Sequence, residues 1–130
     1  MKILKKIVAQ IIEQGKFDLP NECCGYLAGK NSNVVRAFPI KNVDACHDHF
    51  SFDPEEQFAA IKKMRKENIE PVAVYHSHPS TPARPSKEDI RLAYDPDVSY
   101  LIISFASDDP DIKSFKIKDG VVQKEEIKII

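Results

Sequence analysis

Apolar residues recur at helical spacing in the first fourteen positions of the chain. Residues three and four apart share one face of a helix, so this spacing predicts an amphipathic helix over residues 2–14 whose apolar face packs on the core. Gly15 follows the last apolar pair and is expected to end the helix. The residues that carry the pattern are Ile3, Leu4, Ile7, Val8, Ile11 and Ile12.

A hairpin and a second helix are expected next. Two short apolar segments, residues 24–29 and 34–40, are separated by a short polar run that is typical of a β-turn. Further along, Asp53 is a capping acid, a proline follows it at the first helical position, and a glutamate stands three residues after the cap. This combination predicts a helix that begins there and runs to about Glu67.

Residues 72–78 form a run rich in β-branched and aromatic side chains, which predicts a strand. The proline-dense segment 79–85 follows, and it is expected to be a loop because proline cannot continue a strand or a helix interior. Ser86 and Asp89 then repeat the capping pattern, which predicts a short helix to about Tyr94.

The last third of the chain contains a buried strand and a hairpin. Residues 99–105 are almost continuously apolar, as is typical of a central strand covered on both faces. Phe115 and Ile117 alternate with polar residues before Asp119 and Gly120, which form a strong two-residue turn signal. A closing hairpin is therefore expected around this turn.

The length and charge of the chain narrow the function classes. With 130 residues, of which 42% are hydrophobic, we expect one domain over residues 1–130. Lys and Arg total 19 against 20 Asp and Glu, which gives a formal net charge of −1. No basic surplus indicates a nucleic-acid partner or an anionic membrane surface, so we expect neither. The sequence leaves open whether the protein forms a homodimer.

The cysteines and the N-terminal segment indicate a compartment. There are three cysteines, and two of them are adjacent, which suits neither a disulfide framework nor a zinc knuckle. The basic N-terminal segment is interrupted by Lys5, Lys6 and Gln10 and is read as a helix instead of a signal peptide. No apolar stretch approaches the roughly 20 residues that span a bilayer. We therefore expect a cytoplasmic protein.

His76 and His78 form the most informative pair in the sequence. Successive side chains of a strand alternate between its faces, so these two imidazoles point the same way. Their ring nitrogens can converge on one zinc ion at about 2.0–2.1 Å, and Asp89 in the first turn of the next helix is the candidate third ligand. Three protein ligands leave a fourth position for water, which is typical of catalytic zinc.

Together with Glu22, these residues resemble the JAMM (MPN+) metallopeptidase motif. The segment reads His76-Ser77-His78, then seven residues to Ser86, then two residues to Asp89, without a departure from the pattern. The resemblance spans residues 3–127, and the order of elements is similar to that of small prokaryotic members. It implies one Zn²⁺ per chain, held by the two histidines and the aspartate.

The same resemblance implies a fold and an activity. The fold is an α/β, cytidine-deaminase-like mixed β-sheet flanked by α-helices. The activity is hydrolysis of peptide or isopeptide bonds, with Glu22 as the catalytic acid and base and Ser86 as the oxyanion donor. Small prokaryotic relatives act on the C-terminal Gly-Gly tail of ubiquitin-like or sulfur-carrier proteins, so a protein of that kind is the expected partner.

Other interpretations of these residues remain open. A lone Glu22 is most often a surface acid, and Ser86 with Asp89 can be a plain capping box, which is compatible with a catalytic role. Cys23 and Cys24 are expected to be buried without chemistry. The remaining alternatives are weaker: a rival metal cluster at Cys46, His47, Asp48 and His49; a nucleobase deaminase, whose signature is absent; and a non-catalytic MPN-type protein-interaction scaffold.

Overall fold

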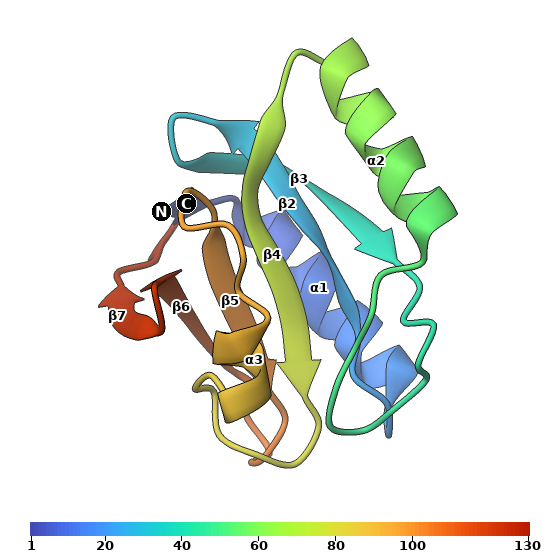
Figure 1. Cartoon of the computed structure of the whole chain (residues 1–130), viewed down its shortest axis with the longest axis vertical. Coiled ribbons are helices and arrows are strands. Elements are labelled where there is room, and N and C mark those ends of the chain that lie inside the picture. The colour runs from blue at the N-terminus through green and yellow to red at the C-terminus, as the bar shows by residue number, and fades with distance from the viewer.

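The computed structural model describes residues 1–130 as one mixed β-sheet with helices on both faces. The eight strands lie in the order β7-β6-β5-β4-β2-β3-β1-β8. This arrangement confirms the α/β class and the flanked mixed sheet (Figure 1). The elements are β1 (Lys2–Ile3), α1 (Lys5–Asp18), β2 (Cys24–Lys30), β3 (Asn33–Ile40), α2 (Pro54–Lys66), β4 (Glu70–His78), α3 (Lys87–Arg91), β5 (Ser99–Ser104), β6 (Asp111–Lys118), β7 (Val121–Glu125) and β8 (Lys128–Ile129).

Helix α1 covers one face of the sheet, and the helical stripe read from the sequence forms its buried side. Ile7 and Ile11 are buried against strand residues such as Leu27 and Leu101 in the largest apolar cluster. The predicted bounds were wrong at both ends, because residues 2–3 form a strand and the helix continues through Gly15 to Asp18. Gly15 does not end the helix. Its missing side chain lets α1 pack closely on Phe105, because a Cβ at this position would lie 2.5 Å from Cε2 of that ring.

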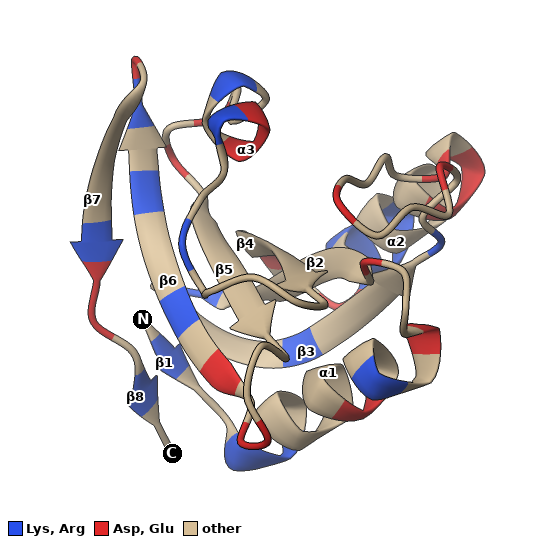
Figure 2. Cartoon of the chain, turned by 90° about the horizontal axis from the view of Figure 1, so that it is seen from below, with Lys and Arg blue, Asp and Glu red and all other residues tan.

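Helices α2 and α3 lie on the opposite face, and Figure 2 shows them together on the side of the sheet away from α1. The predicted start of α2 is confirmed, since Asp53 accepts a hydrogen bond from the Glu56 N–H at 3.0 Å and proline occupies the first turn. Helix α3 also begins after its predicted cap, but it ends at Arg91 and is shorter than expected. A groove lies between the two helices on this face.

Strand β4 lies at the centre of the sheet and carries the two histidines at its end. It pairs with β2 in antiparallel orientation and with β5 in parallel orientation. Ala73 and Tyr75 are buried in the cluster beneath α1. The alternate residues Val74 and His76 line the groove on the opposite face.

The remaining strands complete the sheet at its two edges. The hairpin of β6 and β7 is confirmed, with Gly120 in the turn at a φ of 77°. Strand β8 was not predicted; its two residues pair in parallel with β1, which brings the two ends of the described chain side by side. None of the three helices combines the length and the run of apolar residues that crossing a bilayer requires.

Candidate metal centre

Three side chains converge at the end of β4, as the spacing of the sequence predicts. The Nε2 atoms of His76 and His78 lie 3.1 Å apart, and Oδ2 of Asp89 lies 3.2 Å from the first and 3.1 Å from the second. Both imidazoles are buried, with 2% and 5% of their surface exposed. The three donor atoms therefore form a nearly equilateral triangle, which we call the triad site.

The donor atoms of the triad site suit a divalent cation. Ligands held at about 2.0–2.1 Å in a tetrahedron lie about 3.3 Å apart, close to the observed separations. The Nδ1–H of His78 donates to the carbonyl of Pro82 at 2.9 Å, so the neutral ring presents the lone pair of Nε2 to the triangle. A lone pair aimed at a carboxylate oxygen is repulsive unless a proton or a cation lies between them.

The charges around the triad site also favour a bound cation. Burial would raise the pKa of Asp89. Without a cation, however, the rings of His76 and His78 carry the proton at Nε2, and their hydrogen bonds to the carboxylate outweigh burial and hold that pKa well below its usual range. For His78, burial lowers the pKa, while the bonds to Asp89 and Pro82 raise it more, so the pKa is raised overall. The site thus keeps a negative carboxylate against two imidazoles and favours positive charge.

Ser86 reaches the triad site through Asp89. The Asp89 N–H donates to Oγ of Ser86 at 3.0 Å, and the Ser86 N–H donates to Oδ2 of Asp89 at 2.9 Å. This reciprocal capping box begins α3 and orients the carboxylate toward the two histidines. The capping interpretation of these two residues is therefore confirmed, and the same geometry directs Asp89 into the triad site.

Glu22 lies just before β2, the strand that pairs with the histidine-bearing β4. Cys24 pairs with His76, and the Ser77 N–H donates to the Cys23 carbonyl, which places Glu22 beside the end of β4. Only 3% of Glu22 is exposed, and its buried Oε1 has no hydrogen-bond partner. Burial, followed by the negative charge of Asp89, raises the pKa of Glu22 from 4.5 to about 9.

The segment joining β3 to α2, residues 41–53, holds Glu22 and His76 in place; we call it the β3–α2 loop. The Glu22 N–H donates to the carbonyl of Cys46 at 2.8 Å. Phe50 stacks on His76, with the ring centroids 4.9 Å apart and the planes at 26°. Sequence reasoning did not find Phe50, because an aromatic residue in a loop carries no signal for the ring it covers.

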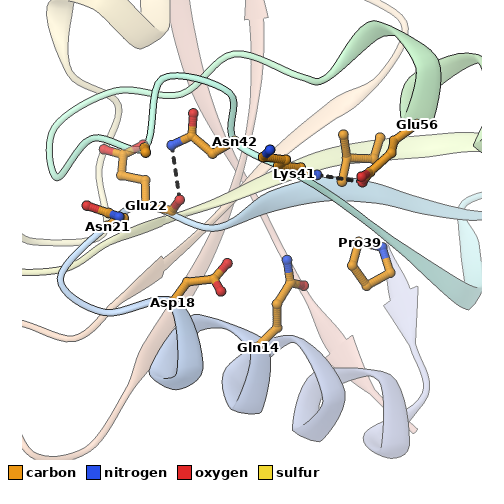
Figure 3. Close-up of a pocket in the computed structure, with 10 residues that line it drawn as sticks. Gln14, Asp18, Asn21, Glu22, Pro39, Lys41, Asn42 and Glu56 are labelled. Carbon is orange, nitrogen blue, oxygen red and sulfur yellow. Dashed lines mark hydrogen bonds between the residues drawn. The ribbon is translucent and has the colours of Figure 1, made fainter.

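Asn42 is a second residue that the sequence did not reveal. Its side-chain N–H groups donate to the carbonyls of Glu22 and His49, and its carbonyl oxygen accepts from the N–H groups of Asp44 and Ser51. Figure 3 shows the amide reaching across to Glu22. One side chain therefore closes the loop and attaches it to the start of β2.

Two concave spaces adjoin these residues. A groove of about 650 Å³ lies between α2 and α3, lined largely by apolar and aromatic side chains, and reaches His76 and Asp89. A separate polar cavity of about 380 Å³ borders Glu22, and Gln14 and Asp18 project into it from α1 (Figure 3). The aromatic residues of the groove are Tyr26, Phe50, Phe52, Tyr94 and Tyr100.

Known proteins resemble the whole chain. The family model described as prokaryotic homologs of the JAB domain matches residues 4–118. A Desulfitobacterium hafniense protein, solved in solution, is 46% identical with a TM-score of 0.91, and the match covers 100% of this chain and 93% of that one. The CysO-cysteine peptidase of Mycobacterium tuberculosis is 32% identical over 129 residues, 95% of this chain and 87% of its own. A JAB1/MPN domain protein of Archaeoglobus fulgidus shares the fold at 20% identity, with a TM-score of 0.68 over 100% of this chain and 99% of that one.

Proposed function

We propose that this chain, which belongs to the family of prokaryotic homologs of the JAB domain, is a JAMM-type zinc peptidase that cleaves at the C-terminal tail of a ubiquitin-like or sulfur-carrier protein. The observation that carries the proposal is the triangle of donor atoms from His76, His78 and Asp89 at 3.1–3.2 Å. These residues would hold one Zn²⁺. When bound, the ion would polarise the scissile carbonyl and make water a nucleophile near neutral pH.

Glu22 is assigned to proton transfer. Its carboxylate is buried beside the triad site, and its Oε1 makes no hydrogen bond that would occupy a lone pair. A carboxylate in this position can take a proton from the attacking water and deliver it to the leaving amine. Burial raises the pKa of Glu22, which makes its carboxylate a stronger base for the water proton than an exposed glutamate.

Ser86 is assigned to the oxyanion. Its Oγ accepts from the Asp89 N–H, which leaves the hydroxyl proton free to donate. The residue lies at the start of α3, next to a ligand of the triad site, where negative charge develops on the carbonyl oxygen. The hydroxyl therefore serves as a donor while its oxygen caps the helix.

The groove between α2 and α3 is assigned to the substrate. It reaches the triad site and runs over the face of β4 that carries Val74 and His76, so an extended chain can lie in it. A Gly-Gly tail has no side chains to obstruct its approach to His76 and Asp89. The name of the CysO-cysteine peptidase at 32% identity supports removal of a small group from a carrier protein.

Zinc content and tail cleavage, measured on the same preparation, test the proposal. We expect about one zinc per chain after dialysis against metal-free buffer, and mass spectrometry of a carrier protein with an extended Gly-Gly tail should show cleavage after the second glycine. His78→Ala should lose both the zinc and the cleavage. A chain that cannot retain zinc, or that holds it and leaves the tail intact while binding the carrier, would instead support the scaffold interpretation.

A further inference from the structure

The β3–α2 loop gathers metal-binding side chains that the triad site does not use. Cys46, His47 and Asp48 each offer one ligand atom, and these atoms all lie within 4.8 Å of one another. Nδ1 of His49 lies 2.9 Å from Oδ1 of Asp48, and Nε2 of the same ring lies 3.4 Å from Oδ2 of Asp44. We call these five residues the loop cluster.

The loop cluster is both accessible and held in shape. The side chains of Asp48 and His49 are 67% and 40% exposed, so an ion can reach them from solvent. The backbone beneath them is fixed, because Asn42 accepts from the N–H groups at both ends of the loop and the Cys46 carbonyl accepts from Glu22. A ligand set on a fixed backbone loses less conformational entropy when it binds an ion than a mobile one does.

We propose that the loop cluster is a second cation site, which binds a zinc-type divalent ion through Cys46, His47 and Asp48. A thiolate, an imidazole and a carboxylate together favour zinc, cobalt or nickel over magnesium or calcium, which prefer oxygen ligands alone. In the present structure the thiol donates its proton to Oδ1 of Asp48 at 3.0 Å. The cation takes the place of that proton, which passes to solvent as the sulfur becomes a ligand.

Sulfur distinguishes the two cation sites. The triad site offers only nitrogen and oxygen, and Cys46 is the one cysteine that is not fully buried. Cys23 and Cys24 are covered by the core, where burial raises the pKa of the Cys23 thiol to about 11 and that of Cys24 higher still. A bond between sulfur and a metal therefore reports the loop cluster alone.

Cobalt titration of the metal-free, reduced full chain tests the proposal. We expect visible absorption from the triad site and, with a further equivalent of Co²⁺, a near-ultraviolet sulfur-to-cobalt charge-transfer band. Cys46→Ser should abolish that band and leave the visible absorption of the triad site unchanged. His76→Ala should do the opposite, so failure of this proposal and failure of the proposed function give different spectra.

Zinc binding provides a second measurement that does not depend on sulfur. Equilibrium dialysis at excess Zn²⁺ should show two ions per chain for the natural sequence and one for Cys46→Ser. His47→Gln and Asp48→Asn should weaken the second ion at least tenfold, while Asp119→Asn, the same charge change in a distant exposed turn, should not. The absence of a charge-transfer band, or a second ion that survives all three loop substitutions, would overturn the proposal.

Discussion

The side-chain amide of Asn42 donates to the backbone carbonyl of Glu22 across 3.1 Å. The same amide bonds His49, Asp44 and Ser51, so its removal leaves four backbone groups without this partner. We expect Asn42→Ala to lower the free energy of unfolding by about 1–3 kcal/mol and to reduce turnover more than substrate affinity. Denaturant unfolding and steady-state kinetics measure the two effects.

Asn42→Asp separates the two halves of this role. The carboxylate can still accept from the N–H groups of Asp44 and Ser51, but it cannot donate to Glu22 or His49. A positioning role therefore predicts a fall in kcat with much of the stability retained. Asn33→Ala, an exposed amide in β3, is the matched control. If Asn42→Asp turns over like the natural chain, the link to Glu22 has no catalytic part.

Glu22→Gln should retain the fold and the zinc but lose activity. The amide keeps the shape of the carboxylate and has no basic lone pair at neutral pH, so the loss of general acid and base catalysis should cost roughly 10²–10⁴-fold in rate. Turnover and zinc content are measured side by side. Full activity in this variant, or loss of zinc from a folded chain, contradicts the assigned role.

Ser86→Ala should reduce turnover by about 10²–10³-fold through the missing oxyanion donor. Part of the effect comes from the cap, because removal of an N-cap side chain costs about 1 kcal/mol of stability. Ser86→Asp keeps a capping oxygen and offers no donor, so it serves as the control for that part. Equal rates for Ser86→Asp and the natural chain would leave Ser86 with a structural role only.

The metal-free chain should lose stability as the pH rises from 5 toward 9. The pKa of Glu22 is raised from 4.5 to about 9, so the folded state keeps a proton that the unfolded state has released throughout this interval. The stability contributed by this group is complete below pH 4.5 and falls as pH approaches 9, at up to about 1.4 kcal/mol per pH unit. Chemical unfolding of Glu22→Gln alongside the natural chain isolates the effect, and parallel pH curves for the two chains would contradict it.

Gly15→Ala should destabilise the chain, although alanine favours helices by about 1 kcal/mol over glycine. The added Cβ would lie 2.5 Å from the ring of Phe105, and overpacking of this kind costs about 1–3 kcal/mol. Thermal unfolding measures the change. Phe105→Leu in the same chain should recover part of the loss by making room, and a stabilised Gly15→Ala chain would show that the ring moves aside freely.

Local patterns in the sequence were sufficient for the elements that carry the triad site. Alternation along a strand put His76 and His78 on one face, and the capping box at Ser86 placed Asp89 at the start of α3. These features depend on neighbours within a few residues, which is why they are legible in the sequence. The strand β8 has only two residues and depends on its pairing with β1, so no local pattern in the sequence predicts it.

The residues that sequence reasoning missed act across longer distances. Gly15 is explained by Phe105, ninety positions later, and Phe50 by the ring of His76. Asparagine is common in turns, so the sequence gives Asn42 no special signal. Only its four hydrogen-bond partners in the structure distinguish it from other turn residues. Tertiary contacts of this kind override local preference without leaving a periodicity that could be read.

The triad site joins two parts of the fold that differ in burial. His76 and His78 belong to the central strand, whereas Asp89 belongs to the crossover between β4 and β5, in a helix of five residues that buries none of them. A cation bound by all three would therefore cross-link the sheet to the crossover. Its departure and the opening of α3 become a single kinetic event, so the slow exchange of α3 amide protons with deuterated solvent should report the residence time of the ion.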